Sequence, residues 1–143
     1  AHEVTAATEH RPGTYIYMDR FQVAKGVGTF DDCALTVLAT VVSRPTEDRA
    51  IIDAGSKALT SDLLGLTGHG YIEAYPEAVI VGLSEEHGTI DLSACSEKPA
   101  IGDKIRIIPN HACVVSNLFD RVTLISGDTV VETVPVDARG RVD

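Results

Sequence analysis

Short apolar segments rich in β-branched and aromatic residues recur along this chain of 143 residues, and turn signals separate them. Valine, isoleucine and threonine are stiff at χ1, which lowers helix propensity and favours pleated strands. Short strands at close spacing are typical of a barrel or a sandwich. We therefore predict a mainly β, β-barrel-like domain with one or two short helical turns. The predicted strands are residues 15–21, 33–43, 50–53, 78–83, 88–92, 104–108, 121–126 and 129–136.

Alternation and hairpin signals support several of these strands. Residues 104–108 alternate charged residues with isoleucine, which is the pattern of a half-buried strand. Residues 84–87 and Gly127-Asp128 each separate two apolar runs, so each pair of runs is predicted to form a hairpin. The long run 33–43 is predicted to end at Arg44-Pro45. Helical turns are predicted near residues 57–64 and 116–120.

Composition and charge exclude several classes of function. The formal net charge of −9 gives a surface that repels phosphate backbones, so we expect no nucleic-acid partner. No run of about 18 apolar residues is present, so we expect no membrane-spanning helix and no membrane partner. The three cysteines, Cys33, Cys95 and Cys113, are an odd number without a CxxC pair. They predict free thiols and a cytoplasmic location.

The most informative segment for chemistry is PNHAC at residues 109–113. It follows the predicted strand 104–108, and in an extended segment residues 111 and 113 project to the same side. The His111 imidazole and the Cys113 thiol are both good zinc ligands, and two ligands suit an open site completed by water or substrate. The alternative is a capping histidine beside a buried core cysteine.

A second candidate is His69, which lies between two glycines in the segment GHG at residues 68–70. Glycine lets a backbone approach a ligand closely, so His69 is a candidate proton carrier or ligand. An exposed histidine in a turn is the alternative.

Two further segments carry weaker signals. Lys57 has the side chain used for Schiff bases, but its acidic surroundings favour a solvated loop lysine. Residues 11–15 could cradle an anion with their backbone amides, or they could simply form a turn that leads into a strand.

Taken together, these segments resemble the C-terminal domain of the D-serine dehydratase-like family, which includes D-threonine aldolases and is related by fold to alanine racemases. The matching segments, in order, are RPGTYIYMD (11–19), DAGSKALTSD (53–62), GHG (68–70), EEHGTIDL (85–92), GDKIRIIPNHAC (102–113) and NLFD (117–120). The resemblance implies a two-domain enzyme. Its N-terminal (β/α)8 barrel holds pyridoxal phosphate (PLP) on a lysine, and its C-terminal β-domain is of the alanine racemase type.

The resemblance also implies how this chain is organised. Residues 1–14 would be a remnant of the end of the barrel domain, residues 15–138 the β-domain, and residues 139–143 a tail. The missing barrel domain is then the expected partner, together with a small D-amino-acid substrate, and the full-length enzyme is expected to be a homodimer. The fragment alone is expected to be inactive.

Site residues carry over from the same resemblance. His111 and Cys113 would bind a divalent metal, and Arg11, Gly13 and Thr14 would lie near the PLP. His69 is the candidate catalytic residue. A thiolate ligand favours Zn²⁺ and a dehydratase, whereas a carboxylate in that place suits Mn²⁺ or Mg²⁺ and is more typical of the aldolases.

The chemistry implied is that of a lyase. PLP serves as an electron sink, and a metal polarises the β-hydroxyl group of a D-3-hydroxy amino acid. Loss of that hydroxyl as water gives dehydration, which we predict, and its deprotonation gives aldol cleavage, which is the alternative. A non-catalytic β-barrel binding module and a small metalloenzyme that uses His111, Cys113 and His69 are the competing hypotheses.

Overall fold

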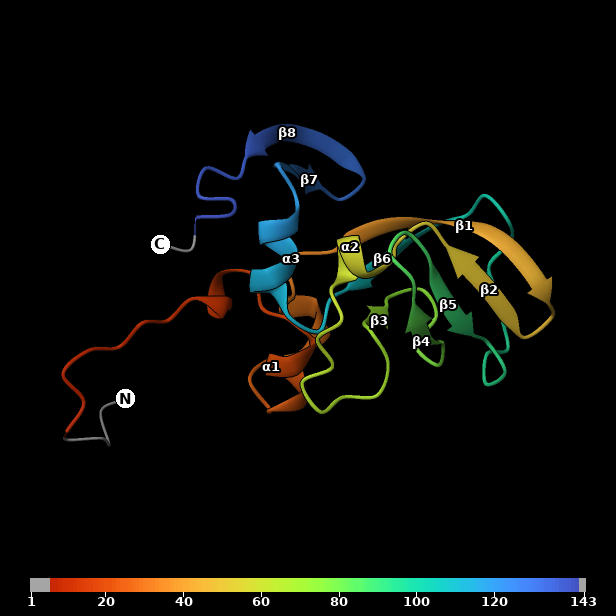
Figure 1. The fold of residues 1–143 in the computed structure, drawn as a ribbon, viewed down its shortest axis with the longest axis horizontal. Helices are drawn as coiled ribbons and strands as arrows, with labels where there is room; N and C mark the ends of the chain where they lie inside the picture. The colour runs from red at the N-terminus through yellow and green to blue at the C-terminus, as the bar shows by residue number, and fades with distance from the viewer. Residues whose placement is uncertain (1–5, 142–143) are drawn as a thin grey trace.

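A computed structural model describes residues 6–141 of the chain (Figure 1). Residues 1–5 of the predicted barrel remnant and residues 142–143 of the predicted tail lie outside the described residues. The helical elements are η1 (Thr14–Ile16), α1 (Arg20–Ala24), η2 (Phe30–Asp32), α2 (Ser56–Leu59) and α3 (Ala112–Leu118). The strands are β1 (Val37–Thr46), β2 (Arg49–Ile52), β3 (Tyr71–Ile72), β4 (Val79–Leu83), β5 (Gly88–Asp91), β6 (Lys104–Ile108), β7 (Arg121–Ser126) and β8 (Thr129–Pro135).

Six strands form one sheet in the order β3-β6-β1-β2-β5-β4, and every neighbouring pair is antiparallel. The two edge strands, β3 and β4, contact each other. The amide of His69, just before β3, donates a hydrogen bond to the Ile80 carbonyl of β4 at 3.1 Å. The sheet therefore curls into a nearly closed barrel, which confirms the predicted mainly β, barrel-like fold.

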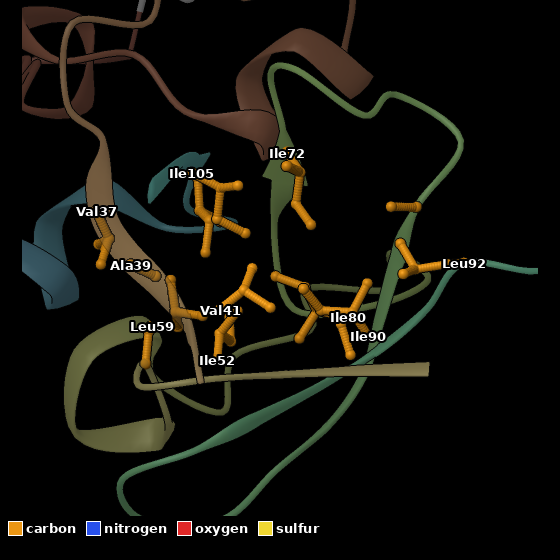
Figure 2. Packing of buried hydrophobic residues seen from close by; sticks show 14 of the residues in the cluster. Val37, Ala39, Val41, Ile52, Leu59, Ile72, Ile80, Ile90, Leu92 and Ile105 are labelled. Carbon is orange, nitrogen blue, oxygen red and sulfur yellow. The ribbon is translucent and has the colours of Figure 1, made fainter. Parts of the chain in front are cut away.

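The core fills the inside of this curled sheet (Figure 2). Side chains alternate along β1, so that Val37, Ala39 and Val41 are buried while Leu38 between them is 61% exposed. Buried residues also pair across strands, as in the register of Val37 opposite Ile107. Each aliphatic side chain that is fully buried contributes about 1.5–3 kcal/mol relative to exposure. The inward-facing set therefore fixes the register, because a shift by one residue would expose it.

Two boundaries of the predicted strand 33–43 were wrong. The strand β1 begins at Val37 because residues 30–32 form η2, whose start carries a reciprocal capping box between Thr29 and Asp32. It also continues through Pro45 to Thr46. Register shifts on both sides of Ser43 make the ladder irregular there, and such irregular positions tolerate proline.

The predicted strand 15–21 was wrong, because most of η1 and the start of α1 lie in this segment. The Asp19 carboxylate caps α1 by accepting a hydrogen bond from the Gln22 amide at 3.0 Å. Such local bonds from a side chain to the backbone compete with strand formation and here outweigh the β propensity of the aromatic residues.

The two predicted helical turns exist with shifted bounds. The turn near 57–64 is α2, and the turn near 116–120 belongs to α3, which begins at Ala112 directly after the PNH segment. The longest helix within residues 6–141 has seven residues, so no helix there could cross a membrane.

The last two strands form a separate two-stranded sheet, the predicted β7–β8 hairpin, which α3 connects to the barrel (Figure 1). Most of its side chains are exposed. An ion pair between Arg106 of β6 and Asp128 of the hairpin turn, at 2.8 Å, links the two sheets.

Candidate metal site

His111 and Cys113 lie at the start of α3, but not in the extended segment that the sequence predicted. His111 has extended backbone angles and is the N-cap residue, whereas Ala112 and Cys113 are the first two residues of the helix. The strand β6 ends earlier, at Ile108. The His111 side chain is 31% exposed, and Cys113 is exposed. Both residues are thus at one helix end, with different backbone geometry.

A buried carboxylate holds this helix end in place. Asp19 is 1% exposed, and its Oδ2 atom accepts a hydrogen bond from the Ala112 amide at 3.0 Å. The amides of Arg20 and Phe21 donate to the carbonyls of Pro109 and Asn110. The same carboxylate therefore caps α1 and satisfies the first amide of α3, where the helix dipole also favours a negative charge.

Asn110, next to His111, anchors the loop of residues 60–70. Its buried side chain donates to the carbonyls of Asp62 and Gly68, both at 2.9 Å, and accepts from Arg20 Nη1 at 3.1 Å. Arg20 Nη1 also donates to the Thr67 carbonyl at 2.8 Å. Burial lowers the pKa of the Arg20 guanidinium, because the charged form loses hydration. The backbone carbonyls of Asp62, Thr67 and Gly68 in this loop thus accept hydrogen bonds from the side chains of Asn110 and Arg20.

Each candidate ligand has a polar neighbour from a distant segment. The His111 Nδ1 atom lies 3.4 Å from the Asp62 carboxylate. The Cys113 sulfur lies 3.3 Å from the Thr14 hydroxyl. A metal ligand is oriented by such outer partners, which fix the tautomer of a histidine and hydrogen-bond a thiolate. Cys113 also lines a surface cavity of about 400 Å³ beside α3 and the chain segment after β8.

Sequence reasoning did not single out Asp62 as a site residue. The only available signal was its place in the segment 53–62, and its partner His111 is 49 positions away. Within residues 6–141, no group of three or more histidine, cysteine, aspartate or glutamate side chains is arranged to hold a metal ion. The start of α3 accordingly carries two candidate donors, the His111 imidazole and the Cys113 thiol.

The other predicted site residues are more scattered. Thr14, expected near PLP, contacts Cys113, and Gly13 is the N-cap residue of η1. Arg11 is exposed and pairs with Glu9 at 2.6 Å, which raises the pKa of the guanidinium.

His69 lies near the closure of the barrel. Within residues 6–141 no hydrogen bond joins its ring to His111 or Cys113, and its buried Nδ1 atom has no partner. Burial lowers the pKa of His69. Its flanking glycines serve packing, because a Cβ atom at Gly70 would lie 2.7 Å from the Ile107 side chain. They bring the backbone close to neighbouring strands.

Lys57 behaves as a surface residue. Its ammonium group lies 2.9 Å from Glu85 and 2.7 Å from Glu86. These carboxylates raise the pKa of Lys57, mainly through the hydrogen bond that its ammonium group donates to Glu86. A lysine that attacks a carbonyl group must be uncharged, so this position does not suit a Schiff base.

Comparison with known proteins identifies related sequences. Residues 34–125, more than half of the chain, match the family described as the putative serine dehydratase domain. The chain is also 40% identical over 117 residues to an uncharacterized protein of Mycobacterium tuberculosis, a match that covers 77% of this chain and 86% of that protein.

Solved structures show the same fold. The D-threonine aldolase from Filomicrobium marinum matches with a TM-score of 0.78 and 33% identity over 93% of this chain and 36% of that chain. The D-threo-3-hydroxyaspartate dehydratase from Delftia sp. HT23 matches with a TM-score of 0.74 and 29% identity over 85% of this chain and 36% of that chain. The chain therefore spans about a third of the length of these two enzymes.

Proposed function

Because the chain belongs to the putative serine dehydratase domain family, we propose that it is the metal-binding domain of a PLP-dependent lyase that removes water from a D-3-hydroxy amino acid. The observation that carries this proposal is the pair His111 and Cys113 at the start of α3, each beside a polar side chain of another segment. The two similar solved enzymes are a dehydratase and an aldolase, and both reactions are lyase reactions.

The donor set fits a zinc ion. Imidazole and thiolate are borderline and soft ligands that suit Zn²⁺, and two protein ligands leave positions for water or substrate. Solved structures of a D-threo-3-hydroxyaspartate dehydratase include variants in which a histidine, or the cysteine two positions beyond it, is replaced by alanine. The cysteine variant is described as metal-free. His111 and Cys113 have the same spacing, which supports a metal site here, and the imidazole and thiolate donors favour Zn²⁺, with Mn²⁺ or Mg²⁺ as alternatives.

The cofactor PLP would be held mainly outside this chain. The paired Lys57 does not suit its attachment, so the proposal requires an N-terminal barrel domain that carries the Schiff-base lysine. Arg11, Gly13 and Thr14 would then lie near the PLP, with Thr14 already in contact with Cys113. The complete enzyme would be a homodimer that takes a small D-amino acid.

The chemistry follows from the charges involved. His111 and Cys113 would hold a divalent cation, which would supply Lewis-acid polarisation of the substrate's β-hydroxyl group, and PLP would supply an electron sink for the α-carbon. Asp19 and Asn110 would keep the two ligands in place, since their hydrogen bonds hold the backbone on both sides of His111. Departure of the hydroxyl as water, then hydrolysis, would release a 2-oxo acid and ammonia.

Aldol cleavage is the alternative outcome. The Filomicrobium enzyme is an aldolase, so the fold accommodates both reactions. A thiolate at position 113 favours zinc and hence dehydration, whereas the aldolase reaction would yield glycine and an aldehyde. His69 stays a proposed proton carrier.

The decisive experiment compares the enzyme that contains this chain, with its barrel domain, to its His111→Ala and Cys113→Ala variants. We expect bound zinc to be lost and kcat/KM for D-serine to fall more than about 100-fold, because each change removes a donor of the cation. Zinc content is measured by mass spectrometry, and 2-oxo acid formation by absorbance. His87→Ala, which alters an exposed histidine of the β4–β5 loop, is the matched control.

Two results bear on the rest of the proposal. Unchanged zinc content and turnover in both variants would show that His111 and Cys113 are not metal ligands. If the products are glycine and an aldehyde, and their formation is lost in His111→Ala, the enzyme is an aldolase and not a dehydratase. The 143-residue chain alone should form no 2-oxo acid, and turnover by the chain alone would contradict its role as one domain of the site.

A cytoplasmic location is part of the proposal. The three cysteines are free, with Cys33 and Cys95 buried and Cys113 exposed. An exposed thiol that serves as a metal ligand must stay reduced, which the cytoplasm maintains.

A further inference from the structure

We propose that Asp62 is a positioning residue that sets the tautomer of His111, so that the ring presents a bare Nε2 atom to the metal. This inference deepens the proposed function and rests on it, because it assigns a role to a residue beside the proposed ligand pair.

The tautomer follows from the chemistry of the two groups. Asp62 Oδ2 lies 3.4 Å from His111 Nδ1, and an ionised carboxylate can only accept hydrogen bonds. A neutral imidazole carries one N–H group, so Nδ1 must be the donor and Nε2 must be bare. The bare nitrogen is the one with a lone pair for a metal. The contact therefore prepares His111 as a ligand before any metal arrives.

The position of the carboxylate is fixed by the fold. The Asp62 amide donates to the Thr60 hydroxyl at 3.2 Å, and the Asp62 carbonyl accepts from Asn110 Nδ2 at 2.9 Å. Asn110 is 1% exposed and directly precedes His111. The buried residue Asn110 therefore positions both partners. Its backbone leads directly into His111, and its side-chain amide group binds the loop that carries Asp62.

The Thr60 backbone adds to this restraint. Thr60 has a φ of +62°, which is uncommon for a β-branched residue, and it is 6% exposed. A backbone in this conformation persists only where surrounding contacts over-determine it. The turn that leads into Asp62 is therefore held in a specific geometry.

A purely stabilising role does not account for this arrangement. The Asp62 and His111 side chains are 41% and 31% exposed, and even with a protonated ring such a partly exposed ion pair contributes little to folding. The carboxylate has a clearer effect on a metal site. An outer carboxylate makes the imidazole a stronger ligand, and its charge balances a divalent cation bound by one thiolate and one neutral ring.

The test uses the metal-free 143-residue chain and its Asp62→Ala variant, with Asp31→Ala as a charge-matched control on an exposed residue. Long-range ¹H–¹⁵N correlation spectra report which ring nitrogen of His111 carries the proton, at a pH well above the usual histidine value of about 6.5. We expect the Nδ1–H tautomer in the wild type and in Asp31→Ala, and a shift towards Nε2–H in Asp62→Ala. An unchanged tautomer in Asp62→Ala would overturn the inference.

Cobalt binding gives a second readout. Co²⁺ is titrated into the same three proteins, and the sulfur-to-cobalt charge-transfer band reports binding by Cys113. We expect the dissociation constant of Asp62→Ala to rise about 10- to 100-fold with the band retained, because only an outer partner is lost. Equal affinity in all three proteins would overturn the inference.

The two readouts separate the inference from the proposed function. If the wild type shows no thiolate band at any Co²⁺ concentration, the metal site fails, but the tautomer spectra still decide the role of Asp62 towards His111. Amide spectra and thermal unfolding of Asp62→Ala confirm that the fold is intact. The fold should persist, because Asn110 contacts the backbone of Asp62 rather than its side chain.

Discussion

His69 carries a buried ring nitrogen, Nδ1, without a hydrogen-bond partner. Its pKa lies below the ordinary value because burial disfavours the charged imidazolium. The folded state thus favours the neutral ring at a place where β3 approaches β4. The consequence is a dependence of stability on pH that a single substitution can isolate.

The sign of this dependence follows from proton linkage. The unfolded chain protonates His69 near pH 6.5, whereas the folded chain does so only at lower pH, so the unfolded state binds more protons between the two values. The stabilising contribution is complete above about pH 6.5 and is lost as the pH falls towards the folded pKa.

We therefore expect the wild type to lose more stability than His69→Gln between about pH 7.5 and about pH 5. Urea unfolding at both pH values measures the difference, and His87→Gln, at an exposed histidine, should behave like the wild type. Equal losses in wild type and His69→Gln would show that the His69 ring is hydrated in solution.

Residue-scale prediction from the sequence was limited by distance along the chain. His111 and Cys113 could be proposed because their spacing is local. Asp62 and Thr14 lie 49 and 99 positions from their partners, so only the folded chain brings them to the pair. Asn110 is adjacent to His111, but its role depends on contacts with the loop 60–70.

At the scale of elements, Asp19 joins two helices. Its two carboxylate oxygens accept from the amides of Gln22 in α1 and Ala112 in α3. The contact with Asp19 determines where α3 starts relative to the barrel, and therefore where His111 and Cys113 lie. These two hydrogen bonds connect two short helices that have little stability of their own.

Replacing Asp19 by alanine should lower the free energy of unfolding by about 2–4 kcal/mol, because it removes a helix cap and leaves the buried Ala112 amide without an acceptor. Urea unfolding followed by circular dichroism measures the loss. The exposed control Asp31→Ala should change stability by no more than about 0.5 kcal/mol. A loss for Asp19→Ala as small as that of the control would mean that water replaces the carboxylate.

Strands were more predictable than helices in this chain. The alternation of residues 104–108 and the hairpin signals at 84–87 and Gly127-Asp128 depend on local pattern, and the structure confirms these elements. The segment 15–21 was mistaken for a strand because its helix depends on the Asp19 cap. The start of α3 was placed too late because its first amide needs a carboxylate from another segment.

At the scale of the whole molecule, the barrel nearly closes where β3 meets β4. Gly70 sits at this closure with a φ of +150°, and the nearest atom to a Cβ built there is the Ile107 Cγ2 atom at 2.7 Å. Ile107 and Ile80, which lie around it, are fully buried. The closure thus needs a residue without a side chain.

We expect Gly70→Ala to destabilise the fold by about 2–4 kcal/mol, since the methyl group would strain the backbone and overpack the core. Gly82→Ala is the matched control, because a Cβ atom there meets nothing within 4 Å, and it should cost at most about 1 kcal/mol. Guanidinium unfolding compares the two. Similar losses in both variants would mean that the closure adapts to the added methyl group.

The N-terminal segment joins the folded domain beside the thiol of Cys113. Residues 6–13 run outward from η1, and Thr14 at its start touches Cys113 (Figure 1). Any group tethered to this arm is therefore an intramolecular neighbour of the sulfur, with an effective concentration on the order of millimolar for a short flexible connection. An affinity tag placed at that end would compete with solutes for the thiol, whereas a covalently attached domain would reach it without a diffusional search.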